Sequence, residues 1–330
     1  MSTAKRKEIL FLWDGENWNP NGDILTGNAP RYDTDAQLAL VTDVRVKRTI
    51  RDFIDLRDKN PKNRIFIKTY MDEDGKYFLD AKSAIKREIP DIEKKKKDEI
   101  KQIVKDNFID IRAFGAVIPI QDKGSKKAAA KDEEKTEKDD SSTGESLTGA
   151  VQFKMSKSIH KVTPVELQGS GAFASSYDEK DTKKQKSNKT FREETYLPYA
   201  MFATYGIVDA FNAKANDFTE DDFVVIRDAL WKGTQNLITR SKIGQKSRLL
   251  LVIEHDDDAG LVGDLNNLLT ISETIEDRAR NISDLELGFD KLIDKINGVK
   301  SALNVNYICD DEFFSQYSTK FPNTWKRILL

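Results

Sequence analysis

The amino-acid sequence predicts an α+β protein built on an antiparallel sheet of the RRM or ferredoxin-like type, with large insertions. Apolar runs of strand length occur at residues 9–13, 109–120, 147–155 and 248–255. Segments with apolar residues at helical spacing separate these runs, most clearly after Thr42 and after Thr219. Single strands divided by helices are typical of this class of sheet.

Composition and charge limit the possible classes of protein further. The 330 residues are 33% charged and 38% hydrophobic, and the formal net charge is −2. This balance does not by itself indicate a nucleic-acid coat, but binding depends on where the cations lie. The single cysteine, Cys309, excludes an intramolecular disulfide and fits a reducing cytosol. We expect a cytoplasmic protein without membrane contact, because the N-terminus lacks a signal-peptide core and no apolar run has membrane-spanning length.

In the first half of the chain, residues 9–13 are expected to form the first strand. Asn-Pro and Asn-Gly steps then predict a turn-rich loop over residues 14–31. Thr42 or Asp43 is expected to cap a helix that ends near Leu56. Residues 65–70 and 109–120 are interpreted as strands, and residues 81–107 as largely helical. Residues 121–146 contain no aromatic side chain and are mostly charged or small, so we expect disorder there.

In the second half, residues 147–155 are expected to form a strand that is entered through Gly149. Residues 165–196 are interpreted as a protruding arm, because two glycines are followed by a basic stretch; its cations are Lys180, Lys183, Lys184, Lys186, Lys189 and Arg192. Residues 197–208 return to the core, and Thr219 is expected to cap a helix to about Ile238. Residues 248–255 predict a buried strand. A helix near residues 285–299 and a strand at 305–308 complete the chain.

Four cations lie beside the apolar stripe of the predicted helix after Thr42. Arg45, Arg48 and Arg51 are three residues apart and therefore near neighbours, whereas Lys47 points elsewhere. Such a strip can bind phosphates, because cations paired with phosphate release counterions. An ordinary solvated helix face explains the pattern equally well, so both interpretations stay open.

Glycine-containing loops are a second class of candidate. Asn21 and Gly22 lie in a turn that could let backbone N–H groups approach a phosphate, although an ordinary turn is the simpler interpretation. Gly169 and Gly171 form a lone GxG pattern without a Walker lysine, so support for nucleotide binding is weak.

An alternating polar pattern follows Val151. If residues 151–160 form one strand, its polar residues share a face, which offers donors to phosphate, sugar and base edges. The wet face of an antiparallel sheet would produce the same pattern. The residues of this face are Gln152, Lys154, Ser156, Ser158 and His160.

The sequence offers little for catalysis. His160 and His255 are the two histidines, and such a pair is conceivable for acid–base cleavage. However, His255 adjoins three successive aspartates at 256–258, which are most simply a solvated turn and point in different directions on a strand. GxSxG, HExxH and clustered Cys/His motifs are absent from the sequence. We therefore expect no catalytic residue, no metal and no cofactor.

Several segments in a fixed order resemble the type I CRISPR Cascade backbone family, especially its type I-B members. They fall between residues 9 and 264, and each is modest alone, whereas the ordered set is specific. The segments are 19–23 (NPNGD), 30–33 (PRYD), 41–52 (VTDVRVKRTIRD), 110–116 (DIRAFGA), 148–153 (TGAVQF), 168–174 (QGSGAFA), 197–200 (LPYA) and 237–242 (LITRSK).

The resemblance implies a hand-like protein. The RRM-like palm comprises residues 1–59, 109–164 and 197–330, with a disordered loop at 121–146. A helical finger insertion comprises residues 60–108, and a thumb comprises residues 165–196. Copies are expected to stack head-to-tail along the guide RNA, which suits an interface that does not close into a ring. Each thumb reaches over the RNA and displaces a nucleotide at regular intervals.

The implied function is that of a non-catalytic backbone subunit of a type I CRISPR-Cas interference complex in antiviral defence. It polymerises along crRNA and presents the guide for pairing with target DNA. Guides vary, so its RNA contacts must be independent of sequence. The expected RNA-binding residues are Asn21, Gly22, Arg45, Lys47, Arg48, Gln152, Ser156, Ser158, His160 and Phe173, although Phe173 could instead pack at the root of the thumb.

The resemblance also implies partners: crRNA, target DNA, further copies of the chain and the other Cascade subunits. These subunits are the 5′-handle-binding, large and small subunits and the crRNA-processing endonuclease. The alternative function is an RNA endonuclease of the same fold. It would use His160 for guide processing, or an acid such as Asp23 or Asp33 for metal-dependent cleavage of target RNA.

Overall fold

A large sheet runs through the centre of the molecule. The computed structural model describes residues 2–118, 145–174, 189–272 and 278–330. The sheet has ten strands in the order β16-β15-β12-β1-β11-β9-β5-β4, and β8 and β10 also pair with β11. Its three central strands are β1 (Lys7–Trp18), β11 (Lys189–Val208) and β12 (Lys246–His255), which pair antiparallel. The predicted α+β class is confirmed.

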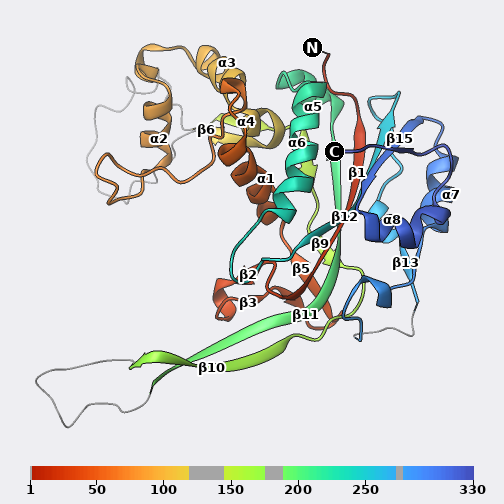
Figure 1. The fold of residues 1–330 in the computed structure, drawn as a ribbon. Coiled ribbons are helices and arrows are strands. Elements are labelled where there is room, and N and C mark those ends of the chain that lie inside the picture. The colour runs from red at the N-terminus through yellow and green to blue at the C-terminus, as the bar shows by residue number, and fades with distance from the viewer. Residues whose placement is uncertain (1, 119–144, 175–188, 273–277) are drawn as a thin grey trace, which may run out of the picture.

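The sheet is covered on both faces, and β1 shows why. Its alternating side chains divide between two cores: Phe11 and Trp13 point into one, and Leu10 and Leu12 into the other. All four are nearly inaccessible to solvent. Burial of each such side chain contributes roughly 1.5–3 kcal/mol. Helices α1 and α6 cover the first face, and α7 and α8 the second (Figure 1). The short apolar run in the sequence is therefore the middle of a longer central strand.

Helices α1 (Asp43–Arg57) and α6 (Glu220–Gln235) begin where their sequences predict. The hydroxyl of Thr42 accepts a hydrogen bond from the backbone N–H of Arg45, and Thr219 forms a capping box with Asp222. Such caps satisfy amides at a helix start that have no partner within the helix. Both predicted caps are confirmed, and α6 ends three residues before the expected Ile238.

The strand predicted at residues 109–120 is not the structure that this segment forms. It forms helix α4 (Ile109–Phe114) and then strand β6 (Gly115–Ile118), which pairs with β7 (Glu145–Thr148). The buried carboxylate of Asp110 accepts hydrogen bonds from the backbone N–H groups of Phe66 and Ile67 and from Arg51 Nε. The expected strand at residues 65–70 is therefore also wrong, since these amides bind a carboxylate and not a neighbouring strand.

Two further segments are divided more finely than the sequence suggests. The helical stretch at 81–107 splits into α2 (Ala81–Glu88) and α3 (Lys97–Asn107), with Pro90 following the end of α2. Because the residue before a proline disfavours helical geometry, the break has a local cause. The expected single strand at 147–155 is wrong, because β7 ends at Thr148 and β8 (Val151–Phe153) pairs with β11 instead.

The predicted arm contains a two-stranded hairpin that leaves the body of the molecule (Figure 1). Strand β10 (Val165–Ala174) pairs with β11 from Val165 opposite Tyr196 outward, and β11 joins β1 from Leu197 onward. One continuous strand therefore links the arm to the central sheet. Residues 175–188, which include Lys180, Lys183, Lys184 and Lys186, lie outside the described residues. So do residues 121–144 of the segment expected to be disordered.

The remaining elements complete the sheet edges and the second core. The expected helix at 285–299 is the shorter α7 (Asp290–Gly298), and the strand at 305–308 is part of β15 (Ala302–Cys309). No helix in the described part of the chain is long and apolar enough to cross a membrane. The other elements are β2 (Gly22–Asp23), β3 (Ala29–Pro30), β4 (Tyr32–Asp33), β5 (Leu38–Val41), β9 (Ser156–Ser158), α5 (Ala210–Ala215), β13 (Thr270–Ile271), β14 (Leu287–Gly288), α8 (Asp311–Tyr317) and β16 (Lys326–Arg327).

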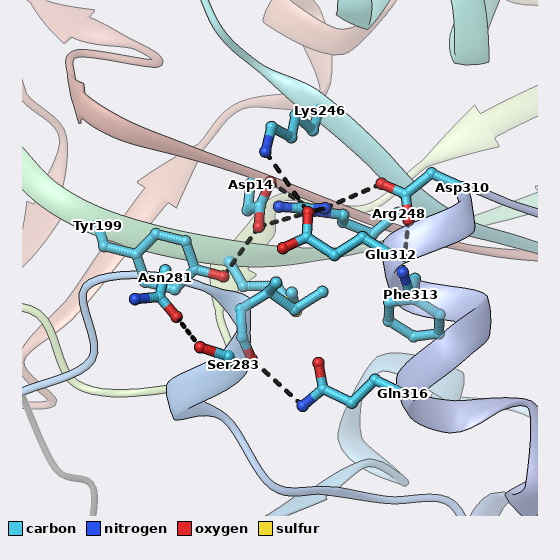
Figure 2. A network of polar contacts seen from close by, with 12 residues as sticks. Asp14, Tyr199, Lys246, Arg248, Asn281, Ser283, Asp310, Glu312, Phe313 and Gln316 are labelled. Atoms are coloured by element: carbon cyan, nitrogen blue, oxygen red, sulfur yellow. Dashed lines mark hydrogen bonds and ion pairs between the residues drawn. The ribbon is translucent and has the colours of Figure 1, made fainter.

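A buried polar network supports the part of β1 that leads to the loop at residues 19–31 (Figure 2). Arg248 Nε on β12 donates to both carboxylate oxygens of Asp14 on β1, each at 2.9 Å. The Arg248 Nη1 atom contacts Asp310 at 2.9 Å and Glu312 at 2.6 Å. Tyr199 on β11 donates to Asp14 at 2.8 Å. Burial raises the pKa of Asp14 to about 6 against the opposing effect of Arg248. The network thus ties three strands to α8.

Candidate nucleic-acid interface

The loop at residues 19–31 is attached directly to the start of α1. The side-chain oxygen of Asn21 accepts hydrogen bonds from the Thr42 backbone N–H at 2.9 Å and from its hydroxyl at 3.0 Å. The Arg31 N–H donates to the Asn21 carbonyl at 2.9 Å. Asn21 therefore has a structural role, and its half-buried amide lies beside the cationic helix. Direct RNA contact by Asn21 stays a prediction.

Gly22 packs closely against the other side of the loop. A Cβ atom at this position would lie 2.0 Å from Oδ1 of Asn28 and 3.0 Å from its carbonyl oxygen, so a side chain here would require Asn28 to move. Asn28 in turn accepts a hydrogen bond at its carbonyl oxygen from the Asn19 side chain at 2.7 Å. The absence of a side chain at Gly22 thus serves close contact within the loop, and its approach to a phosphate stays a prediction.

Lys47 and Gln152 are two predicted site residues that the fold brings together. Lys47 Nζ on α1 donates to Gln152 Oε1 on β8 at 3.1 Å and to Asp43 Oδ2 at 3.1 Å. Only 13% of the Lys47 side chain is exposed, and its ammonium lies 5.9 Å from the centre of the Phe114 ring. Asp43 therefore already balances much of this charge, while Gln152 remains exposed at the surface.

The arginines of α1 differ in their availability. Arg51 forms a buried ion pair with Asp110 at 3.0 Å, so it stabilises the fold. Arg48 is 51% exposed in its side chain and pairs with Asp52 at 2.6 Å across one helical turn. Such a surface pair contributes only about 0.3–0.5 kcal/mol, so a phosphate can displace the carboxylate at low cost.

Arg45 is the third candidate of this helix and has a different environment. Its Nη1 donates to Thr49 Oγ1 at 2.7 Å, and the side chain lines a small cavity whose apolar wall includes Phe11 and Trp13. Burial lowers the pKa of Arg45 despite the opposing charge of Asp52. Within the described residues no carboxylate forms an ion pair with Arg45. Its charge is therefore less compensated than those of Lys47 and Arg48.

The expected polar face of residues 151–160 is not formed. Gln152 is exposed, but Ser156, Ser158 and His160 are 0%, 3% and 4% exposed. Between the pairs Phe153–Gly206 and Lys157–Ala203, this segment advances four residues while β11 advances three. One extra residue exchanges the two faces of a strand, because side chains alternate with a period of two. The interpretation of a shared solvated face is wrong, and Lys157 is the exposed residue of β9.

The buried polar residues of this segment connect it to the neighbouring strands β5 and β11. Ser156 Oγ lies 2.7 Å from Thr204 Oγ1, and Ser158 Oγ accepts from the Ala39 N–H at 3.0 Å. The His160 ring stacks on Tyr199 with 5.5 Å between ring centres. These contacts explain the polar residues without a ligand, so an RNA contact by any of the three would require these contacts to break.

Both histidines are engaged inside the fold. His160 Nδ1 lies 2.8 Å from the Lys161 carbonyl oxygen, and its Nε2 accepts from the Met201 N–H at 3.3 Å. Burial lowers the pKa of His160 to about 4. His255 Nε2 contacts the fully buried Glu8 at 2.9 Å. Neither ring is placed to meet an RNA substrate, which does not favour the nuclease alternative.

The acids proposed for metal-dependent cleavage also have local roles. Asp23 caps a short 3₁₀ turn and pairs with Arg31 at 3.2 Å. Asp33 accepts hydrogen bonds from the backbone N–H groups of Asp35 and Ala36. In the part of the chain that the structure describes, no group of three or more His, Cys, Asp or Glu residues is arranged to hold a metal ion.

Phe173 and Lys242 are the two remaining positions of interest for RNA binding. Phe173 lies in β10, and its side chain is outside the described residues, so its wedge role stays a prediction. Lys242 was missed among the candidates, although it ends the segment 237–242 that carried the family resemblance. It lies in a turn in which its backbone N–H donates to the Thr239 carbonyl, and burial, followed by the charge of Arg45, lowers its pKa. The basic and polar spacing of that segment was the available signal.

Comparison with known proteins gives consistent results. The family model described as CRISPR-associated protein Cas7 matches residues 5–290. A protein of Haloferax volcanii named CRISPR-associated protein Cas7 is 27% identical over 328 residues, covering 94% of this chain and 88% of that protein. Two solved chains share the fold. One, from a CRISPR RNA-guided surveillance complex, pre-nicking, has a TM-score of 0.52 at 13% identity and covers 98% of this chain and 96% of its own. The other, from a CRISPR RNA-guided surveillance complex, has a TM-score of 0.52 at 10% identity with coverages of 98% and 94%.

Proposed function

Because the chain belongs to the Cas7 family of CRISPR-associated proteins, we propose that it is a non-catalytic backbone subunit of a type I CRISPR interference complex. In this function it coats crRNA and presents the guide for pairing with target DNA. The match of the family model over residues 5–290 is the observation that carries the proposal. It extends across the three central strands β1, β11 and β12, the helices α1 and α6, and the arm.

The geometry of the cationic helix supports this function. Asn21 joins the loop to α1, and Lys47 joins α1 to Gln152 on β8, so residues far apart in the sequence form one surface. Arg48 is exposed on the same helix. A surface of cations, amides and hydroxyls suits a phosphate backbone, since it carries no dependence on base identity. Such binding is required of a protein that accepts guides of any sequence.

On this proposal, different parts of the chain have different roles in the assembly. Residues 1–59, 109–164 and 197–330 would form the palm that contains the central sheet. The insertion at residues 60–108, which contains α2 and α3, would act as the finger, and the hairpin at 165–196 as the thumb. On this proposal the projecting hairpin crosses the RNA and meets the next copy in a head-to-tail stack, which can extend as an open helical filament.

The proposed partners follow from this assembly. They are crRNA, target DNA, neighbouring copies of the chain, the 5′-handle-binding, large and small subunits, and the crRNA-processing endonuclease. We assign the complex to a type I-B-like subtype on the basis of the ordered sequence segments, and we place it in the cytoplasm.

The test is RNA binding by the purified chain as a function of salt. We expect affinity for single-stranded RNAs of unrelated sequence to be similar, and to fall steeply between 50 and 200 mM salt, because phosphate contacts release counterions. Reversal of Arg45, Lys47 and Arg48 to Glu should weaken binding at least a hundredfold, with thermal unfolding measured as a folding control. Sequence-selective binding, or a folded triple variant with wild-type affinity, would contradict the proposal.

The endonuclease alternative has its own experiment. The chain is incubated with precursor crRNA and with target RNA, with and without Mg²⁺, and products are separated on a denaturing gel. We expect intact RNA in every case. Cleavage that disappears in His160→Ala or Asp33→Ala would establish the alternative in place of the non-catalytic function.

A further inference from the structure

A serine, a histidine and a glutamate follow one another in a hydrogen-bonded chain where β1 begins and β12 ends. The Ser301 Oγ atom lies 3.1 Å from His255 Nδ1, and His255 Nε2 lies 2.9 Å from Glu8 Oε2. Glu8 belongs to β1, His255 ends β12 and Ser301 directly precedes β15, and these three strands are neighbours in the sheet. Serine hydrolases use the same order of groups, in which a carboxylate orients an imidazole that takes the proton of a serine hydroxyl.

The other contacts of Glu8 determine which nitrogen of His255 carries the hydrogen. The carboxylate accepts hydrogen bonds from the backbone N–H groups of residues 262 and 263, at 2.5 and 2.8 Å, and from the Tyr205 hydroxyl. Because Glu8 acts as an acceptor, His255 Nε2 carries a hydrogen and donates it to the carboxylate. In the neutral ring, Nδ1 is then the nitrogen that can accept the proton of the serine hydroxyl.

Backbone contacts hold the histidine and the serine in place. The His255 N–H donates to the Arg6 carbonyl at 3.0 Å, and the Asp256 N–H donates to the Ser301 carbonyl at 3.0 Å. Glu8 and His255 are almost completely buried, whereas Ser301 is only half-buried. The base is therefore rigidly positioned, and the residue that carries the hydroxyl reaches the surface.

Gly260 keeps the space beside this hydrogen bond free of a side chain. A Cβ atom at this position would lie 2.7 Å from Ser301 Oγ and 2.7 Å from His255 Nδ1. Any larger residue would therefore press on the two atoms that share the proton. The glycine thus preserves the hydrogen bond between the hydroxyl and its base.

We propose that Ser301 is an acceptor site for acyl groups from small activated esters. Ser301 Oγ attacks the ester carbonyl carbon, and its proton passes to His255 Nδ1. The bond between the carbonyl carbon and the leaving oxygen then breaks, and the leaving alcohol takes the proton from His255. The product is a serine ester, and the reaction needs no other reactant. The inference makes no use of the RNA surface and is independent of the proposed function.

The surrounding amides indicate modification of the chain and not rapid turnover. The N–H groups of residues 262 and 263 are bound by Glu8, and the Gly260 N–H donates to the Asp257 carbonyl at 2.9 Å. These three amides are engaged, so they are not available to stabilise an oxyanion, which contributes roughly a factor of 10²–10³ to the rate of a serine hydrolase. We therefore expect slow, stoichiometric acylation, which is compatible with a subunit that catalyses no reaction.

The experiment treats the full-length chain with p-nitrophenyl acetate, and with a fluorophosphonate as a second probe. Peptide mapping by mass spectrometry measures how fast each serine is labelled. Ser315 is the matched control, because it is exposed and its hydroxyl donates to the Glu312 carbonyl at 2.8 Å and not to a base. We expect Ser301 to react at least about a hundredfold faster than Ser315, since a positioned general base typically contributes 10²–10⁴-fold.

Variants test the role of each group. His255→Gln should slow the labelling of Ser301 about a hundredfold, because it removes the base. Ser301→Ala should abolish labelling at this position, whereas Ser315→Ala should leave the labelling of Ser301 at the wild-type rate. Thermal unfolding checks the fold of each variant. The comparison of the two serines within the wild-type chain requires no variant, so it tests the site even if His255→Gln does not fold.

Two results would overturn the inference. One is labelling of Ser301 no faster than that of Ser315 in the wild-type chain. The other is an unchanged rate at Ser301 in a folded His255→Gln variant. Neither result affects RNA binding, so the inference and the proposed function fail separately.

Discussion

Acidification is expected to destabilise the fold through His160, and the size of the effect follows from its surroundings. The Lys161 carbonyl can only accept, so the proton lies on His160 Nδ1. Because the Met201 N–H donates to Nε2, that nitrogen is unprotonated and the ring is neutral. A proton added at Nε2 would face another N–H group in a buried place. Burial lowers the pKa of His160 from 6.5 to about 4, against the opposing effect of the hydrogen bond to the Lys161 carbonyl.

Proton linkage gives the direction and the size of the change in the free energy of unfolding with pH. Between pH 4 and 6.5 the unfolded chain binds more protons at this residue than the folded chain, so the free energy of unfolding rises with pH in this window. The contribution of His160 is complete above pH 6.5 and is lost as the pH falls toward 4. At 1.36 kcal/mol per pKa unit, the loss amounts to about 2.5 kcal/mol at pH 4.5.

The measurement compares wild type with His160→Gln by urea unfolding at pH 7.5 and at pH 4.5. Other groups titrate over this range, including Asp14, whose pKa is raised by burial and which acts in the opposite direction. Taking the difference between wild type and variant isolates His160. We expect the stability advantage of wild type to shrink by about 2.5 kcal/mol on acidification.

Lys157→Gln provides the control, since it lies on the exposed face of the adjoining strand β9. Its difference from wild type should be nearly the same at both pH values. A difference between wild type and His160→Gln that does not change with pH would refute the assignment of His160 as a buried, neutral structural residue.

Two further predictions concern the fold. Arg248→Met leaves the carboxylate of Asp14 buried without its partner and should lower the free energy of unfolding by about 3–5 kcal/mol, measured by chemical denaturation; a loss below 1 kcal/mol would contradict the network in Figure 2. Gly115→Ala should destabilise by more than about 1 kcal/mol, because its φ of 73° is left-handed and a Cβ would lie 2.0 Å from the Leu147 carbonyl oxygen. Both glycine variants are measured by chemical denaturation, and Gly169→Ala, where a Cβ meets no atom within 4 Å, should have little effect.

The parts of the fold that the sequence predicted are those with a strong local signal. The apolar run at the centre of β1 and the threonines before α1 and α6 each act within a few residues, so pattern and structure agree. The segment at 109–114 failed because its apolar alternation is short. Its conformation is set instead by Asp110, which binds backbone amides more than forty residues away in the sequence.

In the candidate site, too, features with a local sequence signal were predicted, and features that depend on distant residues were not. Lys47 and Gln152 were found separately by pattern, and the fold joins them. Ser156, Ser158 and His160 were assigned to the wrong face because a single extra residue in one strand is invisible to an alternation count. Lys242 was missed because its environment depends on burial in the folded chain and on the charge of the distant residue Arg45, which no local pattern contains.

The near-neutral net charge is compatible with the proposed coat once the pairing of charges is considered. Much of the cationic charge of α1 is balanced inside the chain, as for Arg51 with Asp110 and Lys47 with Asp43, and so adds little to the external field. On α1, a polyanion therefore meets few cations whose charge is not already balanced by a carboxylate. A protein that binds once would gain little from so few contacts. A stack of copies on one strand repeats them at fixed spacing, so each added subunit binds at high effective concentration. A low RNA affinity of each single subunit is then enough for a stable filament. The chain therefore needs no large positive net charge.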